Sequence, residues 1–286
     1  MKKIKLLLNA IIGNLYKLKI WFHLWFNIKP QRSNQIAQNV IVSLTSYGRR
    51  ISKCAPYTVF SMIVQTVCPE KITLWIDKDK WNNENLPFAL KRMIKWGYLE
   101  IEFCKDVRSF TKLVPVLSKY SDKAIITIDD DIYYSSNIIE KLYLSFRKYP
   151  DKVNALYVLT YYLDKNNQPK SKIEKKDDFL YEFVHGAGWA GILYPPNCFH
   201  VDISKNDLFM KLCPYADDLW FYFMTFLNNV DTYAVENKDV TYYYTDLFYQ
   251  KHHTGSRLYD TVKVKDFEQM MNIINYYNIN KYGSNS

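Results

Sequence analysis

Short apolar runs alternate with amphipathic stretches through the first half of the chain. The runs are rich in β-branched residues, which is typical of buried strands, whereas the stretches between them have helical periodicity. We expect strands at residues 39–45, 71–76, 98–103 and 124–128, and helices at 56–66, 87–96, 111–120 and 136–149. This repetition predicts an α/β fold with a mostly parallel central sheet covered by helices on both faces. After about residue 150 the pattern is less regular, with a buried helix expected at 215–227.

The first 29 residues combine lysines with Leu, Ile, Trp and Phe. The apolar stretch is short for a bilayer span, and Lys17 and Lys19 fall where its centre would lie. No small-residue cleavage site follows, which argues against a signal peptide. We expect a basic amphipathic helix on the anionic inner face of the cell membrane, in the cytoplasm. The alternative is an ordinary helix packed on its own domain or on a partner chain.

A polar linker follows Pro30, so we expect two parts: residues 1–32, the membrane-interface segment, and residues 33–286, one folded domain. A chain of 286 residues with 48% hydrophobic and 17% aromatic residues is ample for a sizeable core. The five cysteines are widely spaced and form no CxxC pair, which favours a reducing compartment and small buried side chains.

The net charge of +9 is concentrated at the N-terminal end. Ten of the 38 Lys and Arg residues lie before Glu70, the first acidic residue. The rest of the chain is almost neutral. A general nucleic-acid surface requires basic residues clustered on the folded body, so we expect no nucleic-acid partner.

Three consecutive carboxylates, Asp129, Asp130 and Asp131, end the apolar run at 124–128. Adjacent acids repel one another, and a divalent cation such as Mg²⁺ or Mn²⁺ offsets that repulsion while sharing its ligand shell with substrate phosphates. Open α/β sheets also bind ligands at the carboxyl ends of their strands. The alternative is a solvated acidic turn that caps the next helix.

Other expected strand ends also carry residues suited to a nucleotide. Thr45 and Tyr47 offer a hydroxyl and an aromatic face, and Arg49 and Arg50 offer two guanidinium groups for phosphate, although a plain turn would explain them equally well. Asp77 is placed to bond a base or a ribose, or to cap a helix. Lys112 can reach a pyrophosphate as a point charge, whereas a lysine considered alone is more often on the surface.

Three further motifs follow downstream. Gly188 and Trp189 lie in a glycine-rich loop, where the indole ring offers a flat face to a sugar. The alternative is that the glycines only allow a tight backbone path and the loop has no chemical role. Asp217 and Asp218 begin the expected helix at 215–227, where the helix dipole alone explains carboxylates, or where one of them acts as a general base. His252 and His253 lie in a polar loop and suit metal coordination, although exposed loop histidines without function are equally common.

The order of these motifs resembles that of bacterial glycosyltransferases of the GT-A fold, close to the family-2-like enzymes of capsule and surface-polysaccharide synthesis. The likeness spans about residues 39–230. The motifs that carry it are Val42-Ser43-Leu44-Thr45-Ser46-Tyr47-Gly48-Arg49-Arg50, Leu74-Trp75-Ile76-Asp77, Asp129-Asp130-Asp131 and Ala216-Asp217-Asp218. The resemblance implies a Rossmann-like domain that binds a nucleotide-sugar.

The resemblance also implies a role for each acid. Asp129 and Asp130 would face the nucleotide, and Asp131 would hold the metal at the family's DxD position. Ala216-Asp217-Asp218 is similar to the xED motif, with Asp217 replacing Glu on the acceptor or sugar side and Asp218 as the base of an inverting transfer. His253, in preference to His252, is similar in placement to a metal-binding histidine near the C-terminal end of the family's domain.

The expected reaction is therefore a metal-dependent transfer of a sugar from a nucleotide-diphosphate donor to a glycan or lipid-linked acceptor. Two alternatives belong to other classes. A haloacid-dehalogenase-type phosphatase also uses a DxD motif, but normally after the first strand, whereas here the acids follow the fourth. A non-enzymatic scaffold at the membrane surface would use the same acids only as helix caps.

Overall fold

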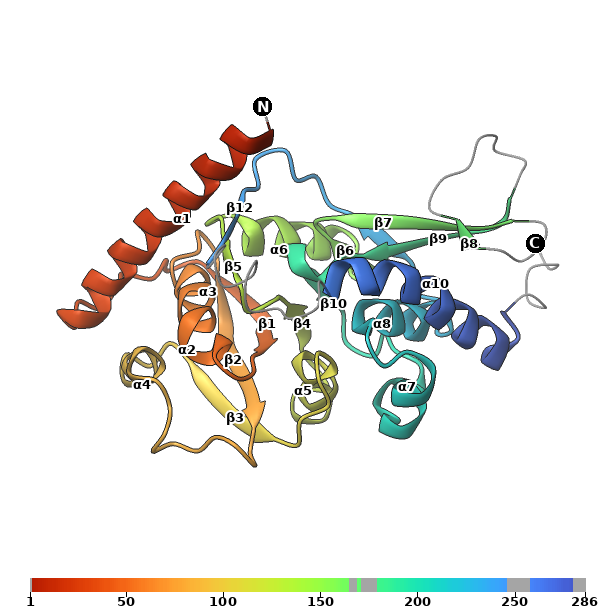
Figure 1. Ribbon diagram of the computed structural model, residues 1–286, viewed down its shortest axis with the longest axis horizontal. Helices are drawn as coiled ribbons and strands as arrows, with labels where there is room; N and C mark the ends of the chain where they lie inside the picture. The colour runs from red at the N-terminus through yellow and green to blue at the C-terminus, as the bar shows by residue number, and fades with distance from the viewer. Residues whose placement is uncertain (1, 165–168, 171–178, 246–257, 280–286) are drawn as a thin grey trace.

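The computed structural model describes residues 2–164, 169–170, 179–245 and 258–279 (Figure 1). Its central sheet has seven strands: β1 (Ile36–Thr45), β2 (Cys68–Asp77), β3 (Glu100–Cys104), β4 (Ala124–Thr127), β6 (Val153–Ala155), β10 (Ile192–Tyr194) and β11 (Thr232–Ala234). Their order is β11-β6-β10-β4-β1-β2-β3. All neighbouring pairs are parallel except those of β10, which runs antiparallel to both β4 and β6. The predicted α/β fold with a mostly parallel sheet is confirmed.

The expected helices are present with small shifts in their bounds. The α-helices are α1 (Lys2–Trp25), α2 (Arg50–Lys53), α3 (Ala55–Ile63), α4 (Phe88–Lys95), α5 (Val114–Lys119), α6 (Ile138–Lys148), α7 (Asn206–Leu212), α8 (Asp217–Phe226) and α10 (Leu258–Tyr277), and the short 3-10 helices are η1 (Phe110–Lys112), η3 (Gly188–Ala190) and η4 (Val201–Ser204). The helix expected at 111–120 is split into η1 and α5. Pro115 explains the break, because it has no N–H to bond the carbonyl of Thr111.

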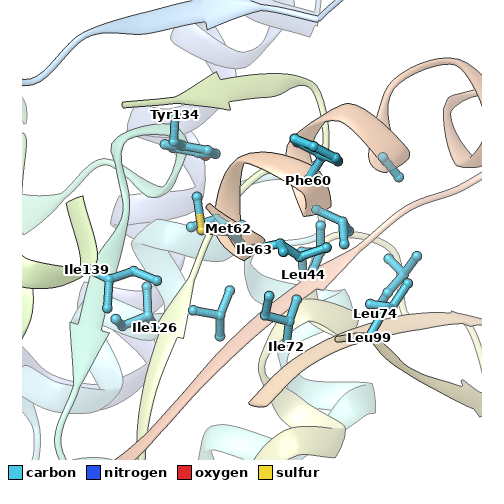
Figure 2. Close-up of a cluster of buried hydrophobic side chains, with 14 of the residues drawn as sticks. Leu44, Phe60, Met62, Ile63, Ile72, Leu74, Leu99, Ile126, Tyr134 and Ile139 are labelled. Atoms are coloured by element: carbon cyan, nitrogen blue, oxygen red, sulfur yellow. The ribbon is translucent and has the colours of Figure 1, made fainter. Parts of the chain in front are cut away.

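Side chains alternate between the two faces of the sheet. On β1, Val40, Val42 and Leu44 enter one core with α1, α3, α4 and α6, whereas Ile41 enters a second core with α5, α7, α8 and α10. Figure 2 shows part of the first core, with Leu44, Phe60, Met62, Ile63, Ile72, Leu74, Leu99, Ile126, Tyr134 and Ile139. Helices therefore cover both faces, as predicted.

The second half of the chain contains strands that the sequence pattern did not predict. β7 (Val158–Asp164), β8 (Pro169–Lys170) and β9 (Phe179–Gly186) form a small antiparallel sheet. β5 (Ile132–Tyr134) pairs with β12 (Tyr242–Tyr244). The β5–β12 pair brings residues 242–245 next to the chain segment that follows the acid triplet.

The parallel strands place their carboxyl ends at one edge of the sheet. β1 ends at Thr45, β2 at Asp77 and β4 at Thr127, two residues before Asp129. This edge is the usual ligand site of an open α/β sheet.

One face of α1 packs on the domain. Ile20 and Leu24 are buried in the first core, and the helix contacts α3 and β12. In the part of the chain that the structure describes, no helix combines the length and apolarity needed to cross a membrane. The division at residues 32 and 33 stays a prediction.

Candidate functional site

Lys112 joins carboxylates from two segments that are distant in the sequence. Its Nζ lies 3.1 Å from Asp129 Oδ1, 2.8 Å from Asp217 Oδ2 and 3.1 Å from Asp218 Oδ1. The Lys112 side chain is 4% exposed, so its interpretation as an ordinary surface lysine is wrong. Ser43 Oγ of β1 donates to the Lys112 carbonyl at 2.6 Å, which holds the end of η1 against the sheet.

A second cation, Arg50, binds the other two acids of the triplet. Arg50 donates to both carboxylate oxygens of Asp130 and lies 2.8 Å from Asp131 Oδ2. Ser46 Oγ also donates to Asp130. The triplet thus divides between two cations, with Asp129 on Lys112 and the other two acids on Arg50.

The contacts of Arg50 and Ser46 with the acids were not predicted, although both residues lie in the motif that follows β1. The prediction chose Arg49, whose side chain is exposed. Gly48 has φ of 52°, a left-handed conformation that glycine adopts without steric cost. The turn that it makes leads into α2 with Arg50 facing the acids. The motif indicated that an arginine here could belong to the site, but it did not indicate which of the two adjacent arginines faces the acids.

The carboxyl group of Asp218 has a pKa raised far above its ordinary value. Burial raises its pKa to about 7, the nearby Asp217 and Asp129 also raise it, and Lys112 and the Gly188 N–H partly oppose the shift. For Lys112, burial by itself would lower the pKa, but the three carboxylates raise it well above the ordinary value. The lysine is therefore a permanent cation, and Asp218 exchanges a proton near neutral pH.

The loop at 186–191 is bonded directly to the acids. The Gly188 N–H donates to Asp218 Oδ2 at 2.6 Å. Tyr134 Oη accepts from the Asp129 N–H at 3.0 Å and donates to the Trp189 carbonyl at 2.9 Å. These hydrogen bonds hold the predicted sugar-binding loop beside Asp218 and beside Asp129 of the acid triplet.

Trp189 presents an aromatic surface next to this cluster. Its side chain is 38% exposed, and its ring lies 5.3 Å from that of Tyr157 and 5.0 Å from that of Tyr242. The Tyr242 hydroxyl donates to the Ala190 carbonyl at 3.1 Å. A half-exposed indole held from two sides is suited to stacking on a sugar ring.

Thr45 and Asp77 make contacts outside this network, whereas Tyr47 lies against Arg50. Thr45 Oγ1 donates to the Trp75 carbonyl at 2.9 Å and ties β1 to β2. Tyr47 is 58% exposed, with the Arg50 guanidinium 5.4 Å from its ring centre. Asp77 accepts from the Asp79 N–H and pairs with Lys80 at 2.8 Å, so it bonds within its own turn. His252 and His253 lie outside the described residues.

The acid triplet offers oxygen ligands of the kind that a divalent metal prefers. Five carboxylates surround two cations, so the cluster keeps an excess of negative charge. Among the described residues, no three His, Cys, Asp or Glu side chains form a group that could hold a metal. Mg²⁺ is commonly held by one or two carboxylates plus substrate phosphates, so a metal at Asp131 would take its remaining ligands from the substrate.

Comparisons with known proteins do not assign the chain to a family. No protein-family model matches it, and no curated protein sequence matches it. Among solved structures it is similar to CMP:2-keto-3-deoxy-manno-octonic acid synthetase complexed with CTP, with 12% identity and a TM-score of 0.40 over 72% of this chain and 90% of that one. It is also similar to 4-diphosphocytidyl-2C-methyl-D-erythritol synthase, with 7% identity and a TM-score of 0.41 over the same shares.

Proposed function

We propose that the protein is a metal-dependent, inverting glycosyltransferase of the GT-A type. It moves a sugar, such as a hexose, from a nucleotide-diphosphate donor to a hydroxyl of a glycan or lipid-linked acceptor in surface-polysaccharide synthesis. The observation that carries this proposal is the meeting of Asp129 and Asp218 on buried Lys112. This meeting supports the proposal because the Asp218 carboxyl group, with a pKa of about 7, lies beside acids suited to a metal-bound diphosphate.

In the transfer, the acceptor hydroxyl oxygen attacks the anomeric carbon as the bond from that carbon to the diphosphate breaks. The diphosphate leaves with the bonding electrons, and the hydroxyl proton moves to Asp218. Gly188 supports this role because its N–H fixes one oxygen of Asp218. Asp217 pairs with Lys112, and Trp189 follows Gly188 in the chain; these two residues are the proposed contacts of the sugar or the acceptor.

The nucleotide side consists of the triplet and the turn after β1. Asp131 would hold Mn²⁺ or Mg²⁺, and Asp129 would face the nucleotide. The metal would stabilise the negative charge that develops on the leaving diphosphate. Asp130 is buried against Arg50 and Ser46, so its proposed part in nucleotide binding is to position the other two acids. Thr45, Tyr47, Arg49 and Asp77 remain the proposed nucleotide contacts at the same edge, with His253 as a proposed further metal ligand.

Thermal denaturation tests the nucleotide and metal assignment. We expect UDP or GDP together with Mn²⁺ to raise the melting temperature more than either does alone, because a ligand that binds only the native state stabilises it. Asp131→Ala should abolish this increase, and Asp122→Ala, an exposed acid in the turn before β4, is the matched control. An unchanged increase in Asp131→Ala would refute the metal assignment.

A donor screen tests the reaction. Nucleotide-sugars are incubated with Mn²⁺, and release of the nucleoside diphosphate is measured. Release of the nucleoside diphosphate that is lost when Asp218 is replaced supports glycosyl transfer. Release of pyrophosphate from a nucleoside triphosphate, or of phosphate from nitrophenyl phosphate in a manner that depends on Asp129, would instead assign the site to nucleotidyl transfer or to a phosphatase.

A further inference from the structure

The outer side of α1 carries a row of large apolar side chains. Ile11, Leu15, Leu18, Phe22 and Trp25 recur at spacings of four and three residues, which places them on one face of the helix. Each is 49–70% exposed. A helix with apolar side chains on two opposite faces is normally covered on both faces. Here the domain covers only the face that lies opposite this row. We call these five residues the outer row.

The opposite face fixes α1 to the domain. Ile20 and Leu24 are buried, and the Tyr16 ring stacks on that of Tyr133 with centres 4.2 Å apart. On the edge of the helix beside the outer row, the half-exposed Trp21 donates from Nε1 to the Tyr57 hydroxyl at 2.8 Å. Figure 1 shows α1 along the outside of the molecule beside α3 and β12. The outer row is therefore held facing away from the domain.

The charge of this segment indicates what covers the outer row. Residues 1–29 contain lysines and no acidic residue, and Lys19 is exposed. A second copy packed on the row would bring lysines together without an acid to pair them, whereas paired helices normally use opposite charges beside their apolar seam. A surface of anionic lipids provides both the apolar depth and the negative charge.

We propose that α1 docks on an anionic lipid bilayer, with the outer row inserted at the level of the headgroups and the lysines beside lipid phosphates. Trp25 lies at the end of the helix, and tryptophan favours this interfacial depth. The helix lies in the plane of the membrane surface and does not cross the bilayer.

Docking fixes the acid cluster relative to the bilayer. Tyr133, under α1, lies two residues after Asp131. The Asp131 carbonyl accepts from the backbone N–H and the hydroxyl of Thr245, at 2.9 Å and 3.0 Å, immediately after β12. If the proposed function holds, this arrangement presents the site to a lipid-linked acceptor. Lipid docking itself does not depend on the enzymatic activity.

Vesicle sedimentation of the full-length protein tests the proposal. We expect it to pellet with vesicles of phosphatidylcholine and phosphatidylglycerol, much less with phosphatidylcholine alone, and less at high salt. Leu15→Gln/Leu18→Gln should weaken binding at least about tenfold, because two side chains lose their apolar burial. Leu144→Gln/Val201→Gln is the matched control, since Leu144 and Val201 are 56% and 80% exposed elsewhere on the surface.

The outcomes separate lipid docking from self-association and from loss of folding. Equal sedimentation of the Leu15→Gln/Leu18→Gln and wild-type proteins overturns the proposal, as does the absence of wild-type binding to anionic vesicles. A wild-type dimer that this variant dissociates would instead assign the outer row to a second copy. A retained melting temperature in the variant shows that its domain is folded, whatever the fate of the proposed function.

Discussion

The Gly188 N–H donates a hydrogen bond of 2.6 Å to Oδ2 of Asp218, and the glycine leaves just enough room for that carboxyl group. A β-carbon at position 188 would lie less than 3.0 Å from Oδ1, Oδ2 and Cγ of Asp218. Real β-carbons essentially never approach other atoms so closely. Glycine at position 188 is therefore needed for the observed position of Asp218.

Replacement of Gly188 by alanine should displace Asp218 while leaving the nucleotide side intact. A displacement on the order of 1 Å at a reacting group can lower turnover about 100-fold. We expect such a loss in kcat for sugar transfer, with an unchanged increase in melting temperature on addition of nucleoside diphosphate and Mn²⁺. Wild-type kcat in Gly188→Ala would contradict the placement of Asp218 at the reacting hydroxyl.

The pH dependence of transfer should follow the protonation of Asp218. A general base must be unprotonated, so kcat/KM should rise about tenfold per pH unit below the pKa and level off above about 7. Lys112 opposes the increase in this pKa, so Lys112→Gln should move the rising limb to higher pH. Initial rates from pH 5 to 9, with circular dichroism as a check on folding, measure both effects. A flat profile in the wild type would exclude Asp218 as the base.

Much of this arrangement could be predicted from the sequence, because strand periodicity and the ends of strands are local features. The run at 124–128 and the acids after it predicted both β4 and the position of the triplet. The meeting of Asp129 with Asp218 could not be deduced in this way. It depends on the packing of α8 against η1, which the residue spacing does not encode.

The features that the sequence did not predict have similar causes. The turn at Gly48 decides that Arg50, rather than Arg49, faces the acids, and a pair of adjacent arginines carries no signal for that choice. β5 and β12 were missed because each is three residues long, too short to show an alternating pattern.

Replacement of Asp218 by asparagine should abolish transfer and stabilise the fold above neutral pH. The folded-state pKa of about 7 exceeds the ordinary value of 3.8, so the native state holds the proton more tightly than the unfolded state does. Native stability is therefore lost through this group as the pH rises from about 4 to 7. Asparagine stays neutral throughout, and we expect Asp218→Asn to melt above the wild type at pH 8 but not near pH 4.

Denaturant unfolding at both pH values measures the Asp218→Asn effect, and the two values should differ in the stated direction. One opposing effect is the loss of a Lys112 partner, although Asp129 and Asp217 remain. A variant less stable than the wild type at pH 8 would show that the ion pair, rather than burial, dominates the energetics of Asp218.

The neighbouring arginines provide a matched pair of variants. Arg50 is 16% exposed and pairs with Asp130 and Asp131, so Arg50→Gln leaves those acids uncompensated and should cost roughly 3–5 kcal/mol of unfolding free energy. Arg49 is exposed, so Arg49→Gln should leave that free energy within about 0.5 kcal/mol of the wild-type value. If Arg49 contacts the donor phosphate, as proposed, Arg49→Gln should still weaken the binding of UDP or GDP with Mn²⁺, measured by titration calorimetry. Equal destabilisation by the two variants would contradict the inward position of Arg50, and unchanged nucleotide affinity in Arg49→Gln would remove Arg49 from the site.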